Sequence, residues 1–282
     1  MTDTTARRAS LWDFANPTRF LGIAGPLIPW LAAATALAFA TGLWLALLAP
    51  EDYQQGRSVL IMFVHVPSAW LSMFCYSIMT LSALGTLVWR HPLADVSVRA
   101  AMAIGAAFTL LALVTGSLWG KPMWGTWWVW DARLTSVLVL FIIYLGLMAL
   151  ARAIEDPVTS ARSVAIVTLV GFINIPIIKF SVDWWNTLHQ PASVSRFGRP
   201  AMDAAFLYPL CAMAIAFTLL FLTLHLMNMR NEILRRRIRS MPCTKPGSHL
   251  PSWAAEVSPL ASPSAIASAA IEPDRSARST PD

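Results

Sequence analysis

Six long apolar stretches constrain this chain more than any other feature of its sequence. They run approximately over residues 26–49, 59–88, 100–119, 134–153, 163–180 and 204–229. A helix needs about 20 apolar residues to cross a bilayer, and each stretch is near or above that length. No alternation with a period of two indicates a membrane barrel, and backbone groups that face lipid must be bonded internally. We therefore predict an all-α, polytopic membrane protein with six transmembrane helices.

Composition agrees with a chain whose main solvent is lipid. Of the 282 residues, 56% are hydrophobic and 13% are charged, whereas soluble domains carry about 25% charged residues. A soluble fold of this size has no means of hiding so much apolar surface. We expect a lipid bilayer as the environment and no nucleic acid as a partner.

Basic residues predict which side of the membrane each terminus occupies. One side, formed by the termini and the second and fourth links, carries twelve arginines: Arg7, Arg8, Arg19, Arg90, Arg99, Arg152, Arg162, Arg230, Arg235, Arg236, Arg237 and Arg239. The opposite side carries six basic residues: Arg57, Lys121, Arg133, Lys179, Arg196 and Arg199. Because Lys and Arg are enriched in cytoplasmic loops, both termini are expected to be cytoplasmic.

This topology predicts three regions. Residues 1–25 form a cytoplasmic amino-terminal arm, and residues 26–239 form the six-helix membrane domain. Residues 240–282 are rich in Pro, Ser and Ala with few large apolar groups. A segment of this composition cannot bury enough apolar surface to fold, so we expect a disordered cytoplasmic tail.

The third link contains an unusual concentration of tryptophan. The segment 119–131, "WGKPMWGTWWVWD", contains Trp119, Trp124, Trp127, Trp128 and Trp130. Interfacial belts explain one or two tryptophans at a helix end, and a belt remains the alternative interpretation here. Three of these tryptophans and Asp131 have the spacing i, i+3, i+4, i+7, which predicts one face of a short helix lying along the interface. Such a face can hold a planar aromatic ligand.

Two of the five histidines are predicted on the same side of the membrane as this segment. His65, in the second span, lies about two helical turns, roughly 9 Å, below the outer surface. His189 follows Trp184 and Trp185 in the fifth link. A histidine in a membrane protein is often only a helix-packing contact. Two neutral imidazoles on opposite sides of an iron porphyrin, however, complete a six-coordinate site, whereas zinc normally takes three or four protein ligands.

Three charged residues lie within or beside the tryptophan segment. Asp131 directly precedes the fourth apolar stretch, so it is expected either to cap that helix or to contact a ligand. Lys121 and Arg133 are either interfacial anchors or partners of the propionate groups of a porphyrin.

Other chemistry is sparse. Cys75, Cys211 and Cys243 form no C-x-x-C or C-x-x-C-H pattern, so neither disulfide exchange nor covalent haem attachment to this chain is predicted. The chain has no phosphate-binding glycine loop and no serine–histidine–acid arrangement. We do not expect an enzyme. Pro67 and Pro176 are expected to kink the second and fifth spans near the outer site.

Three segments carry a resemblance to a known family. "WGKPMWGTWWVWDARLTS" resembles the tryptophan-rich WWD signature of haem-handling proteins. "DYQQG…FVHVPSAW" and "NIPIIKFSVDWWNTLHQ" resemble the six-span cytochrome c maturation protein C family. The resemblance covers most of residues 20–230. It implies that the WWD segment is an external platform for non-covalent haem b, with His65 and His189 as axial ligands of the haem iron.

The resemblance also implies a location and partners. Such proteins present haem at the periplasmic face of the bacterial cytoplasmic (inner) membrane and deliver it to a membrane-anchored periplasmic haem chaperone, for c-type cytochrome biogenesis. They work with ABC-transporter subunits and a small single-span subunit. The large external domain of the related ligases is missing here, which argues against ligation. Two alternatives remain: a permease that exports haem or another hydrophobic substrate through the bundle, and a quinone-binding redox subunit.

Overall fold

The computed structural model describes residues 16–185, 187–189, 199 and 201–241. Six of the helical segments in this part of the chain are long and apolar enough to cross a membrane, in agreement with the predicted all-α, six-span protein. The elements are α1 (Pro17–Leu48), η2 (Arg57–Ile61), α2 (Met62–Val88), α3 (Pro92–Trp124), α4 (Ala132–Ala153), α5 (Pro157–Gly171), α6 (Asn174–Trp184) and α7 (Ala204–Ser240). The short 3-10 helix η2 leads directly into α2, and α5 and α6 together form the fifth span.

The helices extend beyond the predicted stretches, most at α1, α3 and α7. Helix α3 begins at Pro92 rather than near residue 100 and ends at Trp124 rather than near residue 119. Helix α1 begins at Pro17, within the region predicted as an arm, and α7 continues to Ser240, beyond residue 229 where the apolar stretch ends. Much of the basic run near the C terminus is therefore helical. The rest of the predicted arm and nearly all of the predicted tail, residues 1–15 and 242–282, lie outside the described residues. The chain divides into two units, Met1–Arg237 and Ile238–Asp282, and the description that follows concerns the first.

Three of the spans begin with the same local sequence, a polar cap followed by proline. Asn16, His91 and Asp156 accept a hydrogen bond from a backbone N–H of the first turn of α1, α3 and α5, and each is followed by proline. Proline fits the first helical position because its fixed φ suits a helix and its missing N–H has no intrahelical partner there. These caps set where each span begins after a link.

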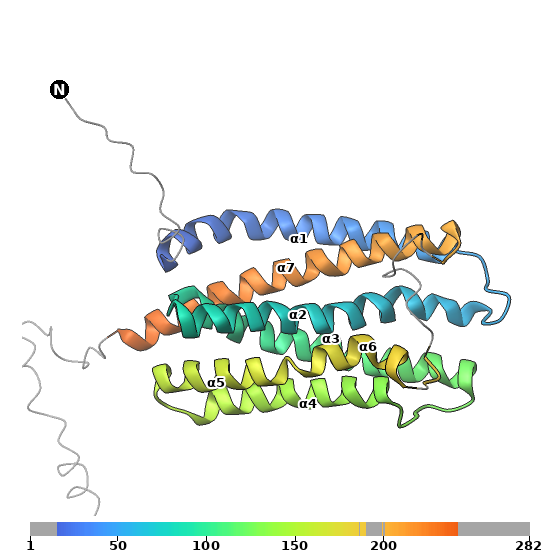
Figure 1. Ribbon diagram of the computed structural model, residues 1–282. Coiled ribbons are helices and arrows are strands. Elements are labelled where there is room, and N and C mark those ends of the chain that lie inside the picture. Colours follow the sequence, from blue (N-terminus) through green and yellow to red (C-terminus); the bar gives the residue numbers. More distant parts are fainter. Residues whose placement is uncertain (1–15, 186, 190–198, 200, 242–282) are drawn as a thin grey trace, which may run out of the picture. The chain divides into compact units, whose positions relative to one another are not determined.

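Consecutive spans run in opposite directions (Figure 1), so their links gather at two ends. The tryptophan end carries the α1–α2 link (49–56), the α3–α4 link (125–131) and the described residues of the α6–α7 link. The basic end carries the α2–α3 and α4–α5 links and the C-terminal turns of α7.

Aromatic rings packed against glycines hold the middle of the bundle together. Tyr76 of α2 and Tyr144 of α4 are fully buried with an edge-to-face ring contact of 5.3 Å. The Tyr76 hydroxyl donates to the Thr168 carbonyl of α5 at 3.1 Å. Gly171 and Gly105 admit these rings, since a Cβ would lie 2.2 Å from Tyr76 Oη and 2.3 Å from Tyr144 Cζ. Small residues permit such close contact between membrane helices, where association depends on packing and interhelical hydrogen bonds.

An ion-pair network around the buried Asp95 joins three helices at the basic end. Asp95 of α3 pairs with Arg99 one turn along the same helix and with Arg236 of α7. Arg99 also donates to Ser160 Oγ of α5 at 2.9 Å. Buried charges require this kind of pairing and hydrogen bonding. Two arginines that the sequence analysis counted only for topology therefore join α3, α5 and α7.

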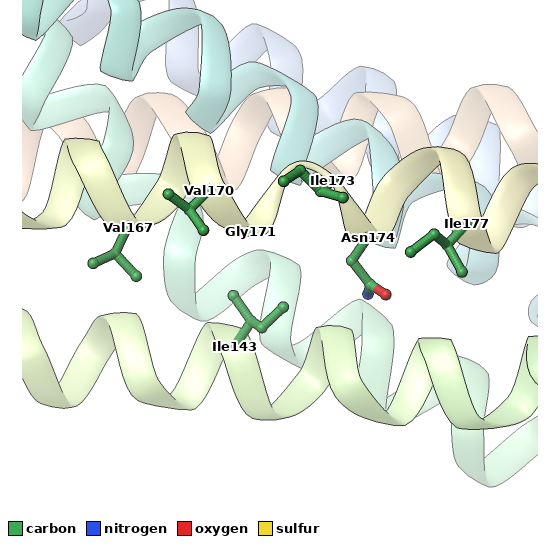
Figure 2. A pocket seen from close by; sticks show the side chains of 7 residues that line it. All are labelled: Ile143, Val167, Val170, Gly171, Ile173, Asn174 and Ile177. Carbon is green, nitrogen blue, oxygen red and sulfur yellow. The ribbon is translucent and has the colours of Figure 1, made fainter.

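The fifth span is broken between α5 and α6, which the sequence predicted as one kinked stretch. Pro176 has no N–H to donate to the carbonyl of Phe172, and that carbonyl accepts from Ile175 N at 2.9 Å instead. Asn174 at the start of α6 donates to the Ser136 carbonyl of α4 at 2.9 Å, which fixes the first turn of α6 against α4. Figure 2 shows the apolar groove beside this break, lined by Ile143, Val167, Val170, Gly171, Ile173, Asn174 and Ile177.

Candidate functional site

The tryptophan segment is a loop between two helices. Helix α3 continues through Trp124 and ends at Gly125, whose φ of 75° is left-handed and whose N–H donates to the Lys121 carbonyl. Residues 126–130 are not helical, and α4 begins after Asp131. The predicted short helix through Trp124, Trp127, Trp128 and Asp131 is therefore wrong. Glycine adopts the left-handed conformation without penalty and ends α3, and Asp131 begins a new helix.

Side chains of α3 and of the loop itself fix the loop conformation. Ser117 Oγ donates to the Trp127 carbonyl at 2.7 Å, and Lys121 Nζ donates to the Gly125 carbonyl at 3.0 Å. Thr126 Oγ1 donates to the Trp128 carbonyl at 3.1 Å. The loop thus folds back against the last turns of α3. Its indoles are held by a structured backbone.

Asp131 caps α4, which is one of the two roles predicted from the sequence. Its Oδ1 accepts from the Leu134 N–H at 2.7 Å. The other oxygen, Oδ2, is buried and has no hydrogen-bond partner among the described residues, and the same is true of Trp128 Nε1. Buried polar atoms are almost always hydrogen-bonded. One acceptor and one donor of the tryptophan segment are therefore buried without a partner among the described residues.

The structure brings His65 and His189 together. Their ring centroids are 6.4 Å apart, although one lies in the first turn of α2 and the other in the α6–α7 link. Trp119 meets His65 edge-on at 5.7 Å, and Trp124 lies 6.2 Å from His189. Four rings from three separate segments thus form a continuous cluster at the tryptophan end.

The spacing of the two imidazoles matches a pair that shares one metal. Metal–imidazole bonds are about 2.0–2.1 Å long and the nitrogen lies about 1.1 Å from the ring centre, so two rings on opposite sides of a metal have centroids about 6.3 Å apart. The observed separation is 6.4 Å. Among the described residues, no group of three or more His, Cys, Asp or Glu side chains is arranged to hold a metal ion.

Lys121 and Arg133 both lie at this end but have different surroundings. Lys121 Nζ is exposed and sits 5.8 Å from the centre of the Trp127 ring. Arg133 Nε donates to Ser181 Oγ at 3.0 Å and Nη2 donates to the Lys179 carbonyl at 3.3 Å, which ties α4 to α6. Arg133 therefore has a helix-packing role, and pairing of either residue with propionates stays a prediction.

The remaining tryptophans form an exposed rim. Trp127 is 54% exposed and Trp130 is 75% exposed, and Trp130 meets Trp128 edge-on at 5.5 Å. At the end of α6, Trp184 and Trp185 make a similar contact at 5.8 Å. Large apolar groups are thus exposed at the tryptophan end, while Trp119 and Trp124 contact the rings of the histidine pair.

Comparison with known proteins decides the family. A model of the family described as heme exporter protein C matches residues 10–244. The chain belongs to this family. It is 68% identical to the heme exporter protein C of Bradyrhizobium diazoefficiens, over 82% of this chain and 88% of that protein. It is 48% identical to the protein of the same name from Escherichia coli K12, over 80% of this chain and 91% of that protein.

The structure adds several residues to the site that the sequence did not reveal. Trp119 Nε1 donates to Gln55 Oε1 at 2.9 Å, so the first link orients an indole of the third. Thr115 Oγ1 lies 3.1 Å from His65 Nδ1, and a Cβ on Gly116 would lie 2.9 Å from His65 Cε1. Thr115 and Gly116 precede Trp119 by four and three residues, the spacing of neighbours on one helix face. That spacing relates them to Trp119, but it does not show that they contact His65 of α2.

Proposed function

We propose that this chain binds haem non-covalently at the tryptophan end and transfers it to a partner during c-type cytochrome biogenesis. The observation that carries this proposal is the 6.4 Å separation of the His65 and His189 rings beside Trp119 and Trp124. The names of the relatives, heme exporter protein C, support it. In this proposal haem b is a cargo and the chain forms no covalent bond to it, so the protein is not an enzyme.

Each part of the site has a task in holding the cargo. The imidazoles of His65 and His189 are the two axial ligands, and indoles add contacts of about 0.5–1.5 kcal/mol per aromatic pair beyond area burial. Trp128 Nε1 and Asp131 Oδ2 supply a donor and an acceptor that the described protein atoms leave unused. The exposed Lys121 and the neighbouring Arg133 bring positive charge to the propionates.

The proposed transfer of haem implies a location and partner proteins for this chain. We place the tryptophan end at the periplasmic face of the bacterial cytoplasmic membrane, where a membrane-anchored haem chaperone receives the cargo. The ABC-transporter subunits and a small single-span subunit are the expected companions. Release requires a residue of the chaperone to replace one of the two histidines as a ligand of the iron. The site therefore needs only moderate affinity for haem.

The test is the absorption spectrum of haem bound to purified protein with single histidine replacements. His65→Ala and His189→Ala are each expected to lose the six-coordinate, low-spin spectrum and to lower the amount of haem bound, because one axial ligand is removed. His249→Ala, which removes an imidazole from the C-terminal tail, is the control and is expected to behave as the wild type. If both site variants keep the wild-type spectrum and haem content, the proposed function is wrong.

A further inference from the structure

The hydrogen bond between His65 and Thr115 has only one consistent direction. Thr115 Oγ1 lies 2.6 Å from the Leu111 carbonyl, one turn earlier on α3, and 3.1 Å from His65 Nδ1. A hydroxyl has one proton to donate and two lone pairs to accept with. A carbonyl oxygen can only accept, so the proton of Thr115 belongs to the bond with Leu111. Thr115 is therefore the acceptor towards His65, and His65 Nδ1 carries the hydrogen.

This direction fixes the tautomer of His65. A neutral imidazole has one N–H, so a proton on Nδ1 leaves the lone pair on Nε2. Histidines that ligate metals almost always donate their other ring N–H to such a partner, which orients the ring and raises the basicity of the ligating nitrogen. We propose that Thr115 is a positioning residue that holds His65 as the Nδ1–H tautomer and presents Nε2 to the haem iron. The inference rests on the proposed function.

The surroundings of the ring on α3 define its orientation further. A Cβ on Gly116 would lie 2.9 Å from His65 Cε1, so the ring occupies space that only glycine leaves open. On the next turn, Trp119 meets the ring edge-on with an angle of 71° between the planes. Two neighbouring turns of α3 therefore orient the imidazole. Thr115 accepts its hydrogen bond, Gly116 leaves space for the ring, and Trp119 packs against it.

This arrangement couples the axial ligand to the tryptophan loop. Thr115, Gly116 and Trp119 belong to the final turns of α3, and the same turns hold the loop through Ser117 and Lys121. His65 belongs to α2, yet its ring is oriented by α3. The end of α3 therefore contacts both the tryptophan loop and the His65 ring.

The first measurement uses haem-free protein, so that it does not depend on cargo. The protein is labelled with ¹⁵N in its histidine rings, and the His65 signals, assigned with the His65→Ala variant, report which nitrogen carries the proton. Wild type and Thr115→Ser are expected to show the Nδ1–H form, and Thr115→Val is expected to shift His65 towards a mixture of tautomers. Thr218→Val is the matched control, because Thr218 makes the same 2.6 Å bond to the carbonyl four residues earlier, on α7.

The second measurement adds haem to the same variants. Thr115→Val is expected to bind haem about 10- to 100-fold more weakly and to shift its electron paramagnetic resonance signature, with both effects reversed in Thr115→Ser. Gly116→Ala is expected to disturb the same signature by pushing the ring. Gly146→Ala is its control, since a Cβ there has no neighbouring atom within 4 Å.

The two measurements separate the inference from the function on which it rests. If Thr115→Val leaves the His65 tautomer unchanged in haem-free protein, the role of Thr115 is refuted even when haem binds through both histidines. If His65→Ala and His189→Ala both leave the haem spectrum unchanged, the proposed function fails and the inference fails with it. A tautomer change together with a weakened haem signature, restored by serine, supports both.

Discussion

The two oxygens of the Asp131 carboxylate are in different situations. Oδ1 caps α4 by accepting from the Leu134 N–H, whereas Oδ2 is buried and without a hydrogen-bond partner among the described residues. The cap explains why the residue is needed for α4 but leaves Oδ2 unexplained. A substitution that preserves the cap while removing the carboxylate therefore distinguishes the two roles.

Asp131→Asn is expected to leave the stability of haem-free protein nearly unchanged, because Asn and Asp cap helices equally well. Asp131→Ala is expected to lower the free energy of unfolding by about 0.5–2 kcal/mol through loss of the cap. Both variants are expected to bind haem more weakly, measured by spectral titration. Asp156→Ala removes the equivalent cap of α5, a 2.7 Å bond to Thr159 N, and is expected to affect stability alone. Wild-type haem affinity in Asp131→Asn would limit Asp131 to capping.

Individual residues differed in how well the sequence revealed them. His65 and His189 stood out because histidine is uncommon beside apolar spans, and the predicted topology placed both on one side; the structure separates their rings by 6.4 Å. Thr115 and Gly116 are ordinary residues for a membrane helix. Their importance comes from the contact of α3 with His65 of α2, and a single sequence does not state which faces of two helices meet.

At the scale of elements, the length of the apolar stretches predicted the spans well. The spacing of residues predicted the local backbone conformation less well. The short helix expected in the tryptophan segment does not exist, because Gly125 ends α3 with a left-handed residue and Asp131 starts α4. The sequence has the i, i+3, i+4, i+7 spacing, but the helix end at Gly125 and the helix start at Asp131 prevent a helix between them. In the fifth span the proline signal at Pro176 was correct, since the helix is interrupted between α5 and α6 although Phe172 and Ile173 keep right-handed helical φ and ψ.

The end of α5 offers a direct test of helix packing. A Cβ on Gly171 would lie 2.2 Å from Tyr76 Oη and 3.1 Å from Ile143 Cγ2, whereas a Cβ on Gly146 would meet nothing within 4 Å. Gly171→Ala is expected to lower the free energy of unfolding by about 1–3 kcal/mol through overpacking, since the Tyr76 hydroxyl must leave the Thr168 carbonyl. Gly146→Ala is expected to be neutral or slightly stabilising.

Reversible unfolding in mixed detergent micelles measures both glycine variants. Tyr76→Phe removes the hydroxyl that the added methyl meets, so combining it with Gly171→Ala is expected to recover part of the lost stability. Equal stability of Gly171→Ala and Gly146→Ala, or a double variant weaker than the sum of its single changes, would contradict the close α2–α5 packing.

The whole molecule has two chemically distinct ends, and the site occupies only one of them. The tryptophan end carries exposed indoles and the histidine pair, while the basic end carries arginines and the ion-pair network of Asp95, Arg99 and Arg236. The twelve-to-six distribution of basic residues between the two sides predicts that the basic end is cytoplasmic. Transfer of haem to a periplasmic partner requires that same orientation, so topology and function are tested together.

Site-directed cysteine labelling decides the orientation. The background has Cys75, Cys211 and Cys243 changed to alanine. Tyr53, in the first link at the tryptophan end, is 91% exposed, and Glu155, in the α4–α5 link at the basic end, is also exposed, so each is replaced by cysteine in turn. A membrane-impermeant maleimide is expected to label Tyr53→Cys in intact spheroplasts, and Glu155→Cys only after the membrane is permeabilised. Labelling both positions after permeabilisation controls for reactivity. The reverse pattern would put the histidine pair on the cytoplasmic side, where it cannot present haem to a periplasmic chaperone.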